Sequence, residues 1–315
     1  MKATWKRLTS RHRKGNFLVV LGHINVDVVY ELSKFPVKGQ SINTGNVMEL
    51  FGGTAGNIAL HASALGLKTA IGCYVGSDFS PDFRKLLMES GVDCHDVIMV
   101  EGERTPRCHI FDTPDGEQTY IIEQGAMAST MDLPLWEDSI SESSVIHIAT
   151  GDPDRYLRAV GKRSYSFDPG QEINYRYNAG KFRKMLGGAN IFFTNEIEMK
   201  MALKLTGAVS EKHLAKRCGT VIKTEGSRGT AIIQEDGVTR VPACRVKNYV
   251  DTIGAGDAFR AGYYAAMEKG YNIVKCVEFG NAMASIAIEG KGGVGSLASY
   301  RQLEKRWNEN YGPSR

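Results

Sequence analysis

The sequence predicts an α/β fold with a central, mostly parallel sheet, helices on both faces of that sheet, and a small antiparallel sheet beside it. In the second half of the chain, short apolar runs alternate with segments of helical periodicity, as in parallel strands joined by right-handed crossovers. Earlier, the β-like runs 107–111 and 118–122 flank Thr113-Pro114-Asp115-Gly116, whose residues favour a hairpin turn. Finally, the glycine-rich turn 251–256 opens a helix with small and apolar residues at helical spacing.

Length and composition indicate one globular unit. The 315 residues are 42% hydrophobic and 23% charged, with a net charge of +4, and no apolar run approaches the ~18 residues of a membrane span. Six cysteines lie scattered at positions 73, 94, 108, 218, 244 and 276, without a CxxC pair or zinc-ligand spacing. We therefore expect a cytoplasmic protein with reduced thiols, bound neither to a membrane nor to nucleic acid.

The basic excess is concentrated in residues 1–15, which contain no acid. We expect this segment to be a solvated N-terminal tail in front of a single domain at 16–315. Contact with nucleic acid or a membrane surface is the alternative for this tail. Its basic residues are Lys2, Lys6, Arg7, Arg11, Arg13 and Lys14.

The first elements follow from apolar patterning. Residues 17–21 read as a buried strand, and the alternation that follows places Asn25 and Asp27 on one face. Polar residues at alternate strand positions often only face water. After an extended segment at 41–50, Gly52 and Gly53 precede a helix that starts at Thr54 and carries Asn57 in its first turn.

In the second half, strands are predicted at 145–149, 165–167 and 190–193, followed by a hairpin of 221–223 and 230–233. Asp152 and Pro153 are typical of an N-cap and a first helical position. Asn195 and Glu198 form the Asn-x-x-Glu pattern of a capping box. Helices are expected at 273–288 and 300–307, and the glycine pattern 290–295 between them reads as a flexible loop, since the strand of a dinucleotide-binding turn is missing.

The glycine-rich turn carries the strongest chemical signal. The first N–H groups of a helix are unpaired and its dipole adds positive charge, so Gly254, Ala255 and Gly256 form a potential anion site. Asp257 follows directly. A carboxylate beside an anion site is electrostatically unfavourable, so we expect it to have a function. Accepting a proton from an alcohol is one such function. The alternative is that Asp257 only caps the helix.

The whole string DTIGAGDAF at 251–259 resembles the C-terminal signature of the ribokinase family of carbohydrate kinases, also called the PfkB family. The resemblance covers about residues 17–308, and the segments 147–154 (HIATGDPD) and 166–171 (SFDPGQ) look most like the archaeal nucleoside kinases of that family. It implies an ATP- and magnesium-dependent kinase acting on the 5′-hydroxyl of a nucleoside. The alternatives are a sugar or sugar-phosphate kinase and, more remotely, a sensor without catalysis.

The resemblance also implies roles for individual residues. Asp257 would be the catalytic base, with an anion hole from Gly254, Ala255 and Gly256. Candidate substrate-binding residues are Asn25, Asp27, Gly52, Gly53, Asn57, Arg107, Asp168 and Gln171. Candidate nucleotide-binding residues are Asn195, Lys223, Thr224, Gly226, Gly229, Asp251 and Asn281. Glu198 and Asn195 would hold magnesium through water molecules.

A lid is expected from residues 36–51 and 104–124, because the family covers its sugar site with such a sheet. Gly52 and Gly53 would be its hinge, since glycine tolerates both signs of φ. In several members of the family this sheet also pairs protomers, which would allow a homodimer here. A phosphorylated substrate would need fixed cations, for which Arg104, Arg107 and Lys38 are available; they read equally well as surface charges.

Overall fold

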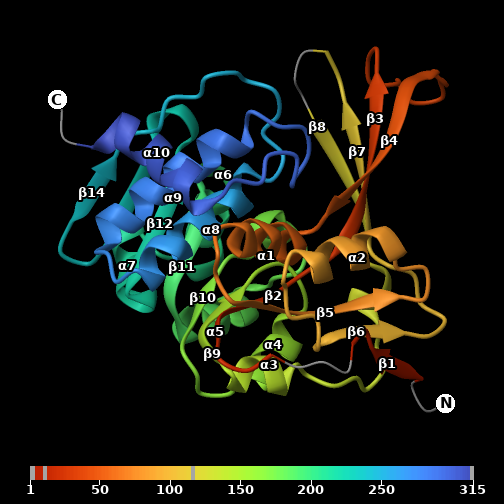
Figure 1. Ribbon diagram of the computed structural model, residues 1–315, viewed down its shortest axis with the longest axis horizontal. Helices are drawn as coiled ribbons and strands as arrows, with labels where there is room; N and C mark the ends of the chain where they lie inside the picture. The colour runs from red at the N-terminus through yellow and green to blue at the C-terminus, as the bar shows by residue number, and fades with distance from the viewer. Residues whose placement is uncertain (1–3, 10–12, 115–117, 313–315) are drawn as a thin grey trace.

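The computed structural model describes residues 4–9, 13–114 and 118–312, and its body is a ten-stranded sheet between two sets of helices (Figure 1). Along the sheet the strand order is β1-β6-β5-β2-β9-β10-β11-β12-β13-β14. These strands are β1 Trp5–Arg7, β2 Asn16–Leu21, β5 Thr69–Gly76, β6 Val97–Val100, β9 Ser143–Ile148, β10 Tyr165–Phe167, β11 Ala189–Asn195, β12 Thr220–Thr224, β13 Thr230–Ile233 and β14 Val238–Val241. The strands from β6 through β12 pair in parallel, and antiparallel pairs occur only towards the two edges, which confirms the predicted fold class.

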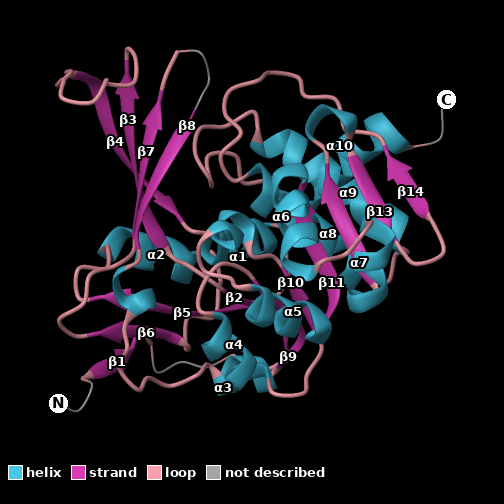
Figure 2. Cartoon of the chain, turned by 180° about the vertical axis from the view of Figure 1, so that it is seen from behind, coloured by secondary structure: helices cyan, strands magenta, loops and turns pink. Residues whose placement is uncertain are grey.

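Helices cover both faces of the sheet. One set contains α1 Thr54–Ala64, α8 Ala255–Glu268, α9 Ile273–Ala287 and α10 Tyr300–Tyr311, with α2 Pro81–Glu89 near α1 (Figure 2). The other contains α3 Glu137–Ser141, α4 Pro153–Val160, α5 Ala179–Gly188, α6 Glu196–Thr206 and α7 Glu211–Cys218. The predicted start of α1 at Thr54, the Asp152 cap of α4 and the Asn195–Glu198 capping box of α6 are confirmed.

A second sheet projects from the body (Figures 1 and 2). Its strand order is β4-β3-β7-β8, formed by β3 Asn25–Leu32, β4 Thr44–Gly52, β7 Arg107–Asp112 and β8 Gln118–Glu123. Strands β4, β7 and β8 come from the two segments predicted to form a lid, and the sheet also contains β3, which the sequence did not assign to them. Residues 36–43 precede β4 without forming a strand. The turn residues Asp115 and Gly116 lie outside the described residues.

The prediction of a solvated N-terminal tail is wrong for residues 5–8. Strand β1 pairs antiparallel with β6, the Leu8 side chain is buried, and Arg7 forms an ion pair with the buried Asp96. Paired backbone and a buried leucine hold this segment on the sheet edge in spite of its basic composition. Lys2 and Arg11 lie outside the described residues. No helix in the described part of the chain has the length and apolar character that crossing a bilayer requires.

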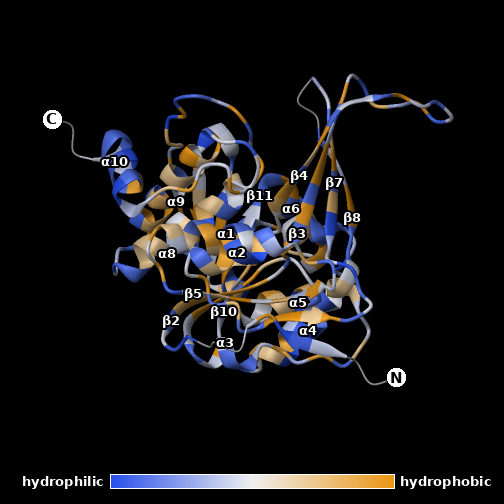
Figure 3. Cartoon of the chain, turned by 45° about the vertical axis from the view of Figure 1, so that its right-hand side comes forward, coloured by the Kyte–Doolittle hydropathy of each residue, from blue (hydrophilic) through white to orange (hydrophobic). Residues whose placement is uncertain are grey.

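Hydrophobic residues gather on the central strands and the inward faces of the helices (Figure 3). All eight residues of β5 are buried. Helices α8 and α9 lie unusually close together at Gly262. A Cβ atom there would lie 2.6 Å from the Phe279 carbonyl oxygen and 2.7 Å from Met283 Cβ. All six cysteines are free thiols, as expected.

Candidate active site

Helix α8 begins in the glycine-rich turn. Gly254 precedes it with φ of +75°, a left-handed conformation that glycine adopts without strain. A Cβ atom on Gly254 would also lie 2.5 Å from Gly293 Cα, so a side chain is excluded sterically. The Ala255 N–H donates to the Thr252 carbonyl at 3.2 Å within the turn. The structure thus forms the predicted helix start, with Asp257 in its first turn.

Asp257 is held from a distant part of the chain. Asn57 Nδ2, in the first turns of α1, donates to Asp257 Oδ2 at 2.8 Å. Burial raises the pKa of Asp257 to about 7, the Asn57 hydrogen bond and the Arg260 charge oppose this rise, and Asp168 and Asp27 add to it. A carboxyl group with a pKa near neutrality is suited to exchange a proton at physiological pH.

Asp27 lies on β3, near the start of the projecting sheet. Asn25 Nδ2 donates to Asp27 Oδ1 at 2.5 Å, and burial raises the pKa of Asp27 to about 7. The two neighbouring glycines are required by close approach. A Cβ atom on Gly52 would lie 2.1 Å from Asp27 Oδ2, and one on Gly53 (φ of +93°) would lie 2.5 Å from the His23 carbonyl oxygen. The polar face of this strand therefore points inward, not into water.

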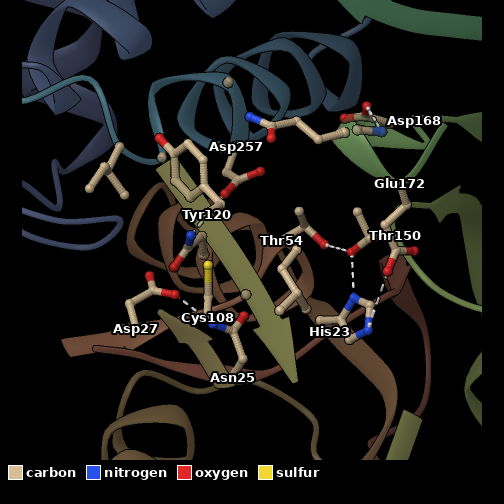
Figure 4. A pocket seen from close by; sticks show the side chains of 18 of the residues that line it. His23, Asn25, Asp27, Thr54, Cys108, Tyr120, Thr150, Asp168, Glu172 and Asp257 are labelled. Atoms are coloured by element: carbon tan, nitrogen blue, oxygen red, sulfur yellow. Dashed lines mark hydrogen bonds and ion pairs between the residues drawn. The ribbon is translucent and has the colours of Figure 1, made fainter. Parts of the chain in front are cut away.

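Both carboxyl groups face one cavity of about 430 Å³. Figure 4 shows Asp27 and Cys108 on one side of Asp257, and Thr150, His23 and Glu172 on the other. The cavity collects most of the predicted site residues: Asn25, Asp27, Gly53, Asn57, Asp168, Gln171, Asn195, Glu198, Thr224, Gly254, Gly256 and Asp257. Asn57 Oδ1 is buried and accepts no hydrogen bond from any described group, which leaves it available to a ligand.

The remaining predicted residues lie outside the cavity lining, and several are engaged with protein groups. Lys223 Nζ contacts Glu211 at 2.6 Å and Glu225 at 2.9 Å. Asn281 accepts from Thr230 Oγ1 at 2.7 Å and donates to the Pro242 carbonyl at 3.1 Å. These contacts account for both side chains without a ligand. Gly52, Arg107, Gly226, Gly229, Asp251 and Ala255 also do not line it.

Asp251 and the loop 290–295 support the turn from behind. Asp251 accepts from the amides of Ile253 at 3.0 Å and Gly292 at 2.9 Å, while His61 Nε2 donates to the Gly293 carbonyl at 2.9 Å. Residues 290–295 form a loop, as predicted, and its backbone is bonded to α1 and to Asp251 at the start of the turn. Asp251 lies just before the turn in the sequence and stabilises it through these two hydrogen bonds.

Glu198 and Asn195 form the capping box in the cavity wall. Glu198 Oε2 accepts from the Asn195 amide at 2.8 Å, and Oε1 accepts from Asn195 Nδ2 at 2.9 Å. Burial and the neighbouring Asp168 raise the pKa of Glu198 to about 7. Each oxygen retains a lone pair, and carboxylate and amide oxygens with water are the donors Mg²⁺ prefers. The donor set fits magnesium bound through waters.

Sequence reasoning missed a polar network at the far side of the cavity. His23 Nε2 donates to Gln124 Oε1 at 2.9 Å, since Gln124 Nε2 is turned to Glu172 at 2.8 Å. His23 Nδ1 lies 2.7 Å from Thr150 Oγ1, which lies 2.8 Å from Thr54 Oγ1. The members come from five separate segments, so no local pattern could reveal them.

Arg260 was also missed, although it left a signal. It is a single cation within the otherwise small and apolar run of α8, one turn after Asp257. Its side chain is only 7% exposed, and Nε lies 2.7 Å from Asp168 Oδ2. A buried arginine needs a carboxylate partner, so its position on the buried face could have indicated this pair.

Comparison with known proteins agrees with this geometry. The sequence profile of the pfkB family carbohydrate kinases matches residues 16–299. The chain belongs to this family. A nucleoside kinase of Methanothermobacter thermautotrophicus is 32% identical over 94% of this chain and 96% of its own length, and one of Methanocaldococcus jannaschii is 30% identical over 92% and 96%. The crystal structure of the Methanocaldococcus jannaschii nucleoside kinase superposes with a TM-score of 0.85, at 29% identity, covering 95% of this chain and 100% of that one.

Proposed function

We propose that this pfkB-family kinase transfers the γ-phosphoryl group of ATP to the 5′-hydroxyl of a nucleoside. One observation carries the proposal: Asp257, at a helix start suited to an anion, is hydrogen-bonded to Asn57 and shares one cavity with Asp27. A volume of about 430 Å³ falls within the range of small-molecule sites, about 300–1,000 Å³. The 30–32% identical relatives that are nucleoside kinases support the choice of acceptor.

The charges of the cavity favour an acceptor without a phosphate. Among the described residues that line it, Arg260 is the single lysine or arginine, and Asp168 already pairs with it. Arg107 lies outside and pairs with Glu49 at 3.1 Å, and the exposed Arg104 lies 3.7 Å from Asp78 and from Glu123. A sugar phosphate would therefore find no unpaired cation in the lining, which weakens the sugar-phosphate alternative.

In the proposed reaction Asp257 accepts the proton of the 5′-hydroxyl as that oxygen attacks the γ-phosphorus. Asp27 accepts hydrogen bonds from the ribose hydroxyls, for which its two oxygens are suited. Asn57 donates a hydrogen bond to Asp257, and its Oδ1 atom remains free to accept one from the sugar. The turn at Gly254 and Gly256, with the α8 dipole behind it, stabilises negative charge on the transferring group. An intact base also argues against a sensor without catalysis.

Asn195 and Glu198 would hold magnesium through waters, and the ion would neutralise charge on the phosphate oxygens. Residues of the chain would also cover the cavity. The lid strands β3, β7 and β8 place Asp27, Cys108, Ile110, Tyr120 and Ile122 over the cavity, where they would exclude water. Gly53 joins this sheet to α1 and would let it rotate as a hinge.

The proposed enzyme works in the cytoplasm, which its six free thiols favour. The lid exposes Val47 and Ile121, which would support a homodimer formed by pairing of two lids.

A substrate panel tests the proposal. Release of ADP is followed with inosine, adenosine, guanosine and cytidine, and with ribose, fructose and fructose 6-phosphate. We expect at least one nucleoside to give the highest kcat/KM, with a 5′-monophosphate as the product by phosphorus NMR. A higher kcat/KM for fructose 6-phosphate than for every nucleoside would assign the protein to the sugar-phosphate kinases instead. Turnover of no acceptor would favour the sensor.

A further inference from the structure

Arg260 is a buried charge that the reaction described so far does not use. It lies three residues after Asp257 on α8, and its guanidinium contacts three different groups. Nε lies 2.7 Å from Asp168 Oδ2, Nη1 donates to the Gly256 carbonyl at 2.9 Å, and the guanidinium carbon lies 5.3 Å from the centre of the Phe193 ring. Together these contacts fix the side chain between the turn, the end of β10 and β11.

The position of Arg260 is more specific than pairing with Asp168 requires. An ion pair buried only for stability gains little over apolar residues of the same size, because desolvation offsets the attraction. Here the pair lines the cavity and is bonded to the residue preceding Asp257. Asp168 Oδ1 accepts from the Gly170 amide at 3.2 Å and Oδ2 faces Arg260, so Asp168 is occupied as the partner of the arginine.

Arg260 also faces an excess of acid. The carboxyl groups of Asp168, Glu198 and Asp257 all act on its charge. Tyr264 on α8 and His147 on β9 also interact electrostatically with Arg260, Asp27 on β3 interacts with Asp257, and α1, which packs against α8, carries His61. Burial lowers the pKa of both histidines, to about 3 for His147, so neither adds positive charge at neutral pH. Arg260 is therefore the fixed cation of this part of the cavity.

We propose that Arg260 is a positioning residue for phosphoryl transfer: anchored by Asp168, it holds the Gly256 carbonyl and provides the buried positive charge against which Asp257 gives up its proton. This inference rests on the proposed function, in which Asp257 is the base. Arg260 and Asp168 act on Asp257 with opposite signs, because the arginine favours the carboxylate and the aspartate disfavours it. This opposition makes the inference testable with two substitutions.

The test is the pH dependence of kcat in Arg260→Met and Asp168→Asn. Loss of the arginine should move the acid limb to higher pH by about one unit, since an adjacent opposite charge changes a pKa by about 1–3. Asp168→Asn should move it to lower pH, because a repelling charge is removed and Arg260 is released. Arg260→Lys keeps the charge and should keep the limb near its wild-type position, even where a changed turn lowers kcat.

A second readout does not depend on turnover. Carbon-13 NMR follows the titration of the Asp257 carboxyl group in the free enzyme, with its signal assigned by its loss in Asp257→Asn. The same opposite shifts are expected there. Arg155→Met is the matched control, because Arg155 is a partly buried arginine that pairs with Asp152 at 3.7 Å and does not line the cavity. It should leave the acid limb and the Asp257 signal unchanged.

The outcomes separate the two proposals. If wild-type enzyme phosphorylates no nucleoside, the proposed function fails, whereas the NMR titration still reports on Arg260. If wild type is active and neither substitution shifts Asp257, or both shift it in one direction, Arg260 has only a structural role and the inference is overturned. Should Arg260→Met fail to fold, Arg260→Gln takes its place, and an unshifted Asp257 titration in that variant overturns the inference.

Discussion

Asp27 and Asp257 face the same cavity and have pKa values raised to about 7 by burial, yet the structure holds them in different ways. Asp257 lies on α8 in the body of the protein and is bonded to Asn57 on another helix. Asp27 lies on a strand of the projecting sheet, and its partner Asn25 is two residues away on the same strand. The body thus fixes the proposed base, while the proposed sugar-binding carboxylate lies on the projecting sheet. The proposed proton transfer and the proposed binding of the sugar are therefore assigned to separate parts of the molecule.

The largest change in activity is expected for substitution of Asp257, and it tests whether the base lies in the body of the protein. Asp257→Asn should lower kcat by about 10²–10⁴, because a general base contributes about that much, while KM for ATP changes little since the turn is kept. Steady-state kinetics with varied ATP measures both. Asp236→Asn, in an exposed turn, is the control and should behave as wild type. More than about a tenth of wild-type kcat in Asp257→Asn would place the base elsewhere, with Asp168 and Asp152 next to be tested.

A smaller effect, mainly on binding, is expected at Asp27. Asp27→Ala should lower kcat/KM for a ribonucleoside by about 10²-fold, the worth of two hydrogen bonds to a charged group. The same variant should handle a 2′-deoxynucleoside nearly as well as the ribonucleoside, because the group that senses the hydroxyl is gone. The ratio of the two kcat/KM values in wild type and variant is the measurement. Undiminished discrimination in Asp27→Ala would show that another residue reads the ribose.

The smallest effect concerns stability, and here the two carboxylates should behave alike. A pKa raised from 3.8 to about 7 means that the folded state favours the protonated acid. The resulting stabilisation is complete below about pH 4 and is lost as pH rises through 7. Asp257→Asn, which is permanently neutral, should therefore melt on the order of a few degrees above wild type at pH 8, with little difference at pH 4. Melting curves at the two pH values decide this, and an equal difference at both would contradict the raised pKa.

The sequence predicted the parts of the site that depend on local pattern. The turn at Gly254, the position of Asp257 in the first turn of α8 and the Asn195–Glu198 box all follow from short motifs with a physical meaning. The mostly parallel sheet followed from the alternation of strands and helices. These features are encoded within a few neighbouring residues.

What the sequence did not predict depends on packing between distant segments. Arg260 meets Asp168 across 92 positions, and His23 meets Gln124 across 101. Lys223 and Asn281 were assigned to the nucleotide by resemblance, yet Glu211 contacts the first side chain and Thr230 the second. The prediction of a solvated tail was wrong at residues 5–8 for a related reason. These residues pair with the edge of β6, which composition alone could not reveal.

The close contact of α8 and α9 at Gly262 lies five residues after Asp257 along α8, about one and a half helical turns away. Because a methyl group there would meet the Phe279 carbonyl at 2.6 Å, any side chain larger than hydrogen has to push the helices apart. Asp257 lies in the first turn of the same helix, so a displacement of α8 would also displace the proposed base. Displacements of about 1 Å can cost about 10²-fold in rate. The absence of a side chain at Gly262 thus sets the spacing of the two helices. That spacing would in turn set where Asp257 lies relative to the nucleophile and the phosphorus.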